Sequence, residues 1–168
     1  NLNPRFGEDF MNKKVAVILC GSGFKDGSEI RESVATLYAL SKHNIEAKCF
    51  ALDENQYHVV NCKNGEELKN QFRNQLIESA RIARGEVFEL KSLKVEEFDA
   101  VILPGGYGAA KNLCNYAFRG IEGTVHAEVL KVLNQFKEAK KPIGAICIAP
   151  MIVAMAFKNK GIKLTLGQ

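Results

Sequence analysis

Cys147 is the residue whose position most clearly suggests chemistry. The run Pro142–Ile146 predicts a short buried strand and Ile148–Phe157 predicts a helix, so Cys147 falls at a strand-to-helix turn. Ala145 and Ala149, two residues to either side, are small, as a sharp nucleophile elbow requires. The free N–H groups of a helix start favour the thiolate. The pattern therefore indicates a nucleophilic thiol, although a buried, inert core cysteine fits the same short segment.

Two glycines follow another predicted strand and would lie at the same edge of a sheet. The run Phe98–Leu103 predicts a buried strand, and Gly105 and Gly106 come shortly after it. The backbone N–H of Gly106, together with that of Ile148, could form an oxyanion hole beside the thiol. A tight turn that needs positive φ is the alternative interpretation of this glycine pair.

Glu29 also has two interpretations. It stands three residues after Asp26, which is the spacing of a capping box at the start of a helix. The first turn of that helix would lie at the same sheet edge as Cys147, where a carboxyl group could tune the pKa of the thiol or carry a proton. The residues alone leave Glu29 as either a structural cap or an acid–base partner.

Other catalytic and ligand-binding patterns are not supported. The three histidines stand far from Cys147 in the sequence, so a Cys–His dyad has no basis. The five cysteines form no CxxC pair and are odd in number, which argues against a disulfide framework and a cysteine-based zinc site. We therefore predict no metal and a reducing, cytoplasmic location. The loop Gly21–Gly27 matches neither nucleotide-binding glycine pattern.

The elements that would position these residues alternate along the chain. Strands separated by amphipathic helices predict a parallel sheet covered on both faces, with ligands outside the carboxyl ends of the strands. We expect apolar helix stripes at Ile30, Val34, Leu37 and Tyr38 and at Val125, Val129, Val132, Leu133 and Phe136. The predicted strands are 14–20, 47–51, 87–90, 98–103, 142–146 and 162–166, with a small hairpin near 57–61; the predicted helices begin at 26 and 124 and span 71–84 and 148–157.

Length and charge bound the remaining possibilities. The 168 residues suit one domain with a real core, and no linker or repeat divides them. A net charge of +4, evenly spread, does not indicate a nucleic-acid partner, and no apolar run approaches a membrane span. Because Met11 is followed by Asn12-Lys13-Lys14 like a natural start, we interpret residues 1–13 as an N-terminal extension or vector remnant.

The sequence contains four ordered segments of note, Cys20–Ile30, Glu78–Gly85, Leu103–Leu113 and Pro142–Pro150. Together they resemble one family, the enhancing-lycopene-biosynthesis branch of the PfpI group in the class I glutamine amidotransferase-like superfamily. The resemblance implies a flavodoxin-like three-layer α/β sandwich with a mainly parallel sheet. It also implies that residues 14–168 are the amidotransferase-like domain without its C-terminal part, since the family continues with a hairpin, a strand and a helix.

The resemblance assigns roles to individual residues. By this resemblance, Cys147 is the nucleophile and Glu29 is the acidic residue that contacts its thiol. Gly106 and Ile148 match the oxyanion donors. The pocket lining is implied to include Gly105, Lys111 and Asn112.

An activity follows from the same resemblance. The bacterial members are associated with a cofactor-free glyoxalase activity that turns glyoxal into glycolate, and loosely with isoprenoid output. We therefore expect a glyoxalase-type lyase (hydro-lyase class) that acts on a small-molecule carbonyl substrate without cofactors. Relatives often form dimers, so by analogy a homodimer is a further expectation.

Two alternatives remain open. A redox sensor or protective protein would use an oxidisable Cys147 without physiological turnover. An amide or peptide hydrolase is disfavoured, because Ile148 stands where peptidase-like relatives carry a histidine.

Overall fold

One parallel sheet forms the centre of the protein. The computed structural model describes residues 13–165, and its five strands are β1 (Lys14–Leu19), β2 (Glu46–Ala51), β3 (Val87–Glu89), β4 (Ala100–Leu103) and β5 (Ile143–Ala145). They pair in the order β3-β2-β1-β4-β5, every pair parallel. The order reverses between β1 and β4, which places a binding crevice at the carboxyl ends of those strands.

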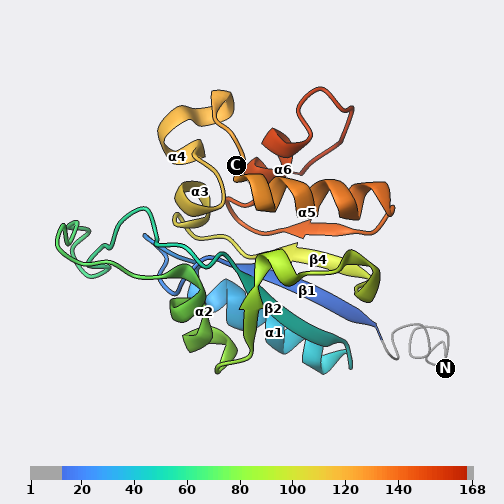
Figure 1. Ribbon diagram of the computed structural model, residues 1–168, viewed down its shortest axis with the longest axis horizontal. Helices are drawn as coiled ribbons and strands as arrows, with labels where there is room; N and C mark the ends of the chain where they lie inside the picture. Colours follow the sequence, from blue (N-terminus) through green and yellow to red (C-terminus); the bar gives the residue numbers. More distant parts are fainter. Residues whose placement is uncertain (1–12, 166–168) are drawn as a thin grey trace.

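Helices cover the sheet on both sides, as predicted (Figure 1). Helices α1 (Ile30–Lys42) and α2 (Gln75–Ala83) lie on one face. The other side carries α3 (Ala109–Asn112), α4 (Tyr116–Arg119), α5 (Ala127–Glu138) and α6 (Pro150–Ala156). Short 3-10 turns occupy Leu90–Ser92, Val95–Glu97 and Gly120–Glu122. The structure therefore has the flavodoxin-like three-layer α/β architecture.

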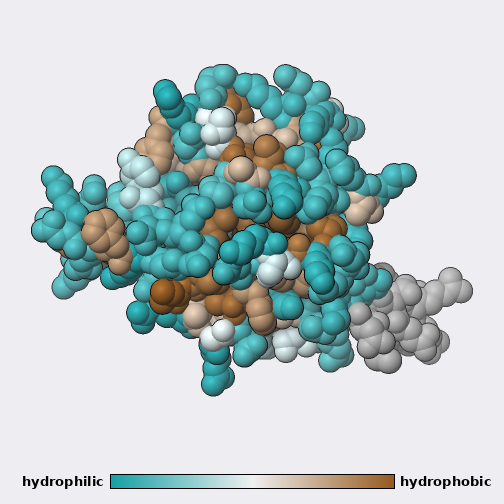
Figure 2. Space-filling view, viewed as in Figure 1, coloured by the Kyte–Doolittle hydropathy of each residue, from teal (hydrophilic) through white to brown (hydrophobic). Residues whose placement is uncertain are grey.

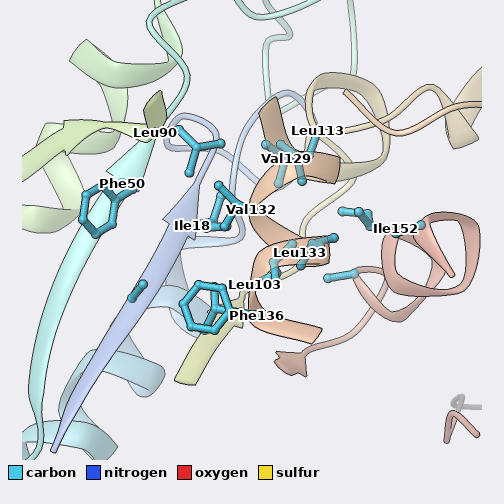
Figure 3. Packing of buried hydrophobic residues seen from close by; sticks show 14 of the residues in the cluster. Ile18, Phe50, Leu90, Leu103, Leu113, Val129, Val132, Leu133, Phe136 and Ile152 are labelled. Atoms are coloured by element: carbon cyan, nitrogen blue, oxygen red, sulfur yellow. The ribbon is translucent and has the colours of Figure 1, made fainter. Parts of the chain in front are cut away.

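The larger part of the core lies between the sheet and α5. Val129, Val132, Leu133 and Phe136 of α5 are all buried in one cluster with Ile18 of β1 and Leu103 of β4, and Phe136 lies beside Leu103 (Figure 3). Burial of each such side chain contributes about 1.5–3 kcal/mol to the free energy of unfolding. This packing confirms four of the five residues predicted for the stripe of α5. The helix begins at Ala127 rather than at 124, so Val125 precedes it and instead bridges to Cys114 while still packing against the core.

Helix α1 packs differently from the prediction. Ile30, Val34 and Tyr38 of its expected apolar stripe are 46%, 50% and 67% exposed, while Ser33 and Thr36 are buried. The Ser33 and Thr36 hydroxyls donate to the carbonyl oxygens of Glu29 and Glu32 at 2.7 Å, so their burial leaves neither hydroxyl unsatisfied. The buried face of α1 is therefore formed by Ser33, Thr36 and Leu40, which the spacing of apolar residues alone does not reveal.

Two short predictions also need correction. The strand expected at 162–166 is absent from residues 162–165, which have no regular structure, and 166 lies outside the described residues. The hairpin near 57–61 is reduced to one bridge between Val60 and Glu67, in a segment that projects from the body in Figure 1. The extension predicted for residues 1–13 lies almost wholly outside the described residues.

Figure 2 shows that hydrophilic residues cover most of one face. Hydrophobic residues appear there mainly in a band at the level of the sheet, between the two helix layers. Within residues 13–165 no helix combines the length and the hydropathy that crossing a membrane would need.

Candidate active site

Cys147 lies on a strained elbow between β5 and α6. Strand β5 ends at Ala145 and α6 begins at Pro150, and between them Cys147 has a φ of +57°. Left-handed backbone costs a non-glycine residue roughly 1–2 kcal/mol, so the surrounding fold must hold it there. The side chain is exposed. An exposed thiol on a strained turn is the geometry expected of a nucleophile elbow.

Two backbone N–H groups are directed at the Cys147 sulfur. They belong to Ile148 and Gly106, and both act to lower the pKa of the thiol. Gly106 has a φ of +100°, and a Cβ on it would lie 2.4 Å from the backbone nitrogen of Glu29. Only glycine allows this approach, so the loop after β4 can aim its N–H toward the neighbouring strand end.

The carboxylate beside the thiol belongs to Glu32. It is hydrogen-bonded with Cys147, and its Oε2 accepts the backbone N–H of Gly105 at 2.8 Å. A Cβ on Gly105 would stand 2.7 Å from that oxygen and 2.8 Å from the Cys147 Cβ. Gly105 therefore makes room for both side chains, and one carboxylate ties the nucleophile to the glycine loop.

The pKa of the Cys147 thiol is raised from its ordinary value. Although the residue is exposed at the surface, partial desolvation of its thiol is the largest cause, followed by the hydrogen bond with Glu32 and the charge of the Glu32 carboxylate. These outweigh the N–H groups of Ile148 and Gly106. The helix start does favour the thiolate, as expected, through the Ile148 N–H, but the desolvation of the sulfur and the Glu32 carboxylate beside it outweigh this effect.

Glu29 is the N-cap of α1, and within residues 13–165 no hydrogen bond joins its carboxylate to the Cys147 thiol. Its carboxylate accepts the backbone N–H of Glu32 at 2.7 Å and lies 3.7 Å from the Arg31 guanidinium. The helix begins at Ile30 rather than at Asp26, which is buried and accepts the Val60 N–H at 2.8 Å. The contact with Cys147 that the resemblance implied for Glu29 is thus made by Glu32.

A signal for Glu32 was present in the sequence. Glu29 and Glu32 have the same three-residue spacing as Asp26 and Glu29, so the cap can be placed in either register. In the observed register Glu32 stands in the first turn, where side chains lean toward the helix start and hence toward the strand ends. The choice between the registers depended on Asp26, which the 56–62 segment holds in place.

Asn112 joins three loops and is buried. Its amide nitrogen donates to the carbonyl oxygens of Asp26 at 2.9 Å and Cys20 at 3.3 Å, and its Oδ1 accepts the Tyr57 N–H at 2.8 Å. These bonds connect the loop after β1 to the 56–62 segment, so Asn112 has a structural role beside the crevice. Lys111, the other residue implied to line the pocket, lies on a separate cavity that is described below.

No histidine is among the groups that shift the pKa of Cys147. His126 caps α5 by accepting the Glu128 N–H, and His58 contacts Lys111. Over the described range, 13–165, there is no group of three or more His, Cys, Asp or Glu side chains that could hold a metal ion.

The parallel sheet, the cysteine on a left-handed elbow and the facing glycine loop define a class I glutamine amidotransferase-like domain. More specifically, the chain belongs to the DJ-1/PfpI family, which it matches over residues 13–167.

Three known proteins are closely similar. The rat "ES1 protein homolog, mitochondrial" is 46% identical over 154 residues, which is 92% of this chain and 57% of that protein. The human "Glutamine amidotransferase-like class 1 domain-containing protein 3, mitochondrial" is 44% identical over the same shares. A solved Ehrlichia chaffeensis "isoprenoid biosynthesis protein with amidotransferase-like domain" is 46% identical, with a TM-score of 0.82 over 88% of this chain and 67% of that one.

These comparisons correct one prediction. The chain spans 57% of the length of the two mammalian relatives, and both are mitochondrial proteins by name. The cytoplasmic location that we predicted is therefore wrong. Unpaired cysteines indicate a reducing environment, and they do not distinguish between reducing compartments.

Proposed function

We propose that this chain is a glyoxalase-type lyase that converts glyoxal to glycolate through Cys147, without a cofactor. The observation that carries the proposal is the contact of one carboxylate, Glu32, with an exposed thiol on a nucleophile elbow. Turning a dicarbonyl into a hydroxy acid requires one nucleophile and one group that moves a proton between the two carbons. These two groups meet at this site.

The first step forms a bond between the Cys147 sulfur and one aldehyde carbon of glyoxal. Glu32 takes the thiol proton as the sulfur attacks. The thiol therefore does not have to ionise beforehand, although its pKa is raised. The carbonyl π bond becomes an oxyanion, which the Gly106 and Ile148 N–H groups stabilise. Protonation of that oxygen by Glu32 gives a hemithioacetal and restores the carboxylate.

The second step is an internal oxidation and reduction. Glu32 removes the hydrogen from the carbon bonded to sulfur and returns a proton to the neighbouring carbon through an enediol. The first carbon becomes a thioester and the second an alcohol. Water then hydrolyses the thioester, which releases glycolate and the free thiol, so that glyoxal and water yield glycolate and one proton.

Product formation tests the proposal directly. The native protein is incubated with glyoxal, and glycolate is followed by NMR in water and in D₂O. We expect saturable glycolate formation. Deuterium on the CH₂ carbon in D₂O would support the enediol route and show that the proton carried by Glu32 exchanges with solvent before its return. No glycolate at high protein concentration would refute the proposal.

The exposure of Cys147 also supports a second function, that of a redox sensor or protective protein. The raised pKa of the thiol counts against it, because the thiolate is the form that peroxide oxidises. Mass spectrometry after mild peroxide treatment separates the two functions. Selective oxidation of Cys147 in a protein that makes no glycolate would favour the sensor.

A further inference from the structure

A cavity of ≈ 470 Å³ lies beside the loop that follows β4. Neither Cys147 nor Glu32 is among the described residues that line it. One part of its wall is aromatic and aliphatic and consists of Phe24, Val60 and Tyr107. The other part carries the basic side chains of Lys25, His58 and Lys111. The volume lies within the range of small-molecule sites, roughly 300–1,000 Å³.

The Lys111 ammonium is held from two sides. Its Nζ donates to the Lys25 carbonyl oxygen at 2.8 Å and lies 2.8 Å from His58 Nε2. The His58 Nδ1 lies 3.7 Å from the Glu67 carboxylate, which favours a proton on Nδ1 and leaves Nε2 to accept from Lys111. An ammonium has three donors. One therefore remains for a ligand in the cavity, and the nitrogen lies 4.4 Å from the centre of the Tyr107 ring.

No carboxylate touches the Lys111 ammonium: within residues 13–165 none lies within 4.0 Å of the Lys111 or Lys25 nitrogen. Asp26 and Glu67 favour the charged form of Lys111 from a greater distance. The one carboxylate on the cavity, Glu67, is half-exposed and pairs with His58. Burial lowers the pKa of Lys111, which shows that its charge has lost part of its hydration. A partly buried charge normally has a counter-ion.

We propose that this cavity binds a small organic anion, with a carboxylate or phosphate group on Lys111 and a short apolar part against Phe24, Val60 and Tyr107. The anion supplies a negative charge in direct contact with the ammonium, which Asp26 and Glu67 do not, and takes the free ammonium donor. The apolar walls contribute by excluding water. This site is separate from the reaction proposed at Cys147, whose substrate glyoxal carries no charge.

Binding of matched probes tests the proposal. Butyrate, monobutyl phosphate and butan-1-ol are titrated into the native protein by calorimetry, and the better of the two anions identifies the preferred head group. We expect butan-1-ol to bind at least about tenfold more weakly than that anion, because it cannot replace a charge-assisted hydrogen bond. Equal binding of the alcohol, or no binding of either anion, would overturn the proposal. The same titration of Cys147→Ala must still succeed, which keeps this outcome independent of the glyoxalase chemistry.

Variants locate the site. Lys111→Met should weaken binding of the preferred anion at least about tenfold, whereas Lys131→Met, on the exposed face of α5, should leave it unchanged. Unchanged affinity in a folded Lys111→Met protein would contradict the site. If that variant does not fold, NMR of the native protein decides: the anion must shift the ring signals of His58 more than those of His126.

Discussion

Two cysteines follow strands of the same sheet, yet their surroundings differ in almost every respect. Cys20 comes directly after β1 and is 1% exposed, with its backbone N–H bonded to the Ser28 hydroxyl at 2.8 Å. Burial raises the pKa of its thiol to about 12. Cys147 follows β5, is exposed, and lies against Glu32. A place after a parallel strand is therefore not enough to make a cysteine reactive.

The backbone accounts for the difference. Cys20 is not among the residues with positive φ, and Ser28 and Asn112 hold it between two loops. Cys147 adopts a φ of +57°, which turns its side chain out of the sheet and into the reach of Glu32 and the glycine loop. The strained residue is the one that gains contacts suited to catalysis, and that relation can be tested.

The largest contrast is expected from removing each thiol. Cys147→Ala should abolish glycolate formation, because no other group on the site can form the thioester. Cys20→Ala should keep its kcat and lose roughly 1–2 kcal/mol of unfolding free energy through the small cavity it leaves. NMR of product and urea denaturation measure the two effects. Equal activity in both variants would show that Cys147 does not carry the reaction.

The two glutamates at the start of α1 should differ nearly as much. Glu32→Gln should lower kcat by about 10²–10⁴-fold, the usual contribution of a general acid–base group. Glu29→Ala should cost about 1 kcal/mol of stability as a lost N-cap and change kcat less than about tenfold. The reverse ranking would return the acid–base role to Glu29.

Substitution of Gly105 tests whether the site requires the close contact of this loop with the side chains of Glu32 and Cys147. Gly105→Ala places a Cβ 2.7 Å from the Glu32 Oε2, so we expect a loss of at least about tenfold in kcat and a cost of about 1–3 kcal/mol in stability. Gly85→Ala is the control, since its φ is +90° and nothing lies within 4 Å of the added Cβ. The control should lose roughly 1 kcal/mol of stability but no activity. Full activity in Gly105→Ala would mean that the loop yields without disturbing Glu32.

The rate of thiol alkylation is expected to change least. In Glu32→Gln this rate should change in the opposite direction to turnover. Because the pKa of Cys147 is raised, its reaction with iodoacetamide should rise with pH through a midpoint above that of a free thiol. Glu32→Gln removes the opposing charge, so the midpoint falls and labelling near neutral pH becomes severalfold faster while turnover becomes slower. Cys20, buried and with a pKa near 12, should stay unlabelled in the folded protein. Slower labelling of Glu32→Gln would contradict the contact between carboxylate and thiol.

Local patterns in the sequence determined most of the architecture and half of the site. The alternation of apolar runs and amphipathic segments predicted all five strands within about two residues, because buried parallel strands leave a plain apolar signature. The small residues around Cys147 predicted its elbow, and the pair Gly105-Gly106 predicted the close approach after β4. Each of these features depends on a few neighbouring residues.

Only the tertiary structure decided which carboxylate meets the thiol and which groups surround Lys111. The register of the α1 cap depends on Asp26. Its carboxylate accepts a hydrogen bond from the backbone N–H of Val60, 34 positions away in the sequence, and is therefore not free to cap the helix. The contact of Lys111 with His58 likewise spans 53 positions. The buried face of α1 includes Ser33 and Thr36, whose hydroxyls bond to carbonyl oxygens one turn earlier, where apolar side chains had been expected. Such contacts join segments that only the folded chain brings together, so no local spacing encodes them.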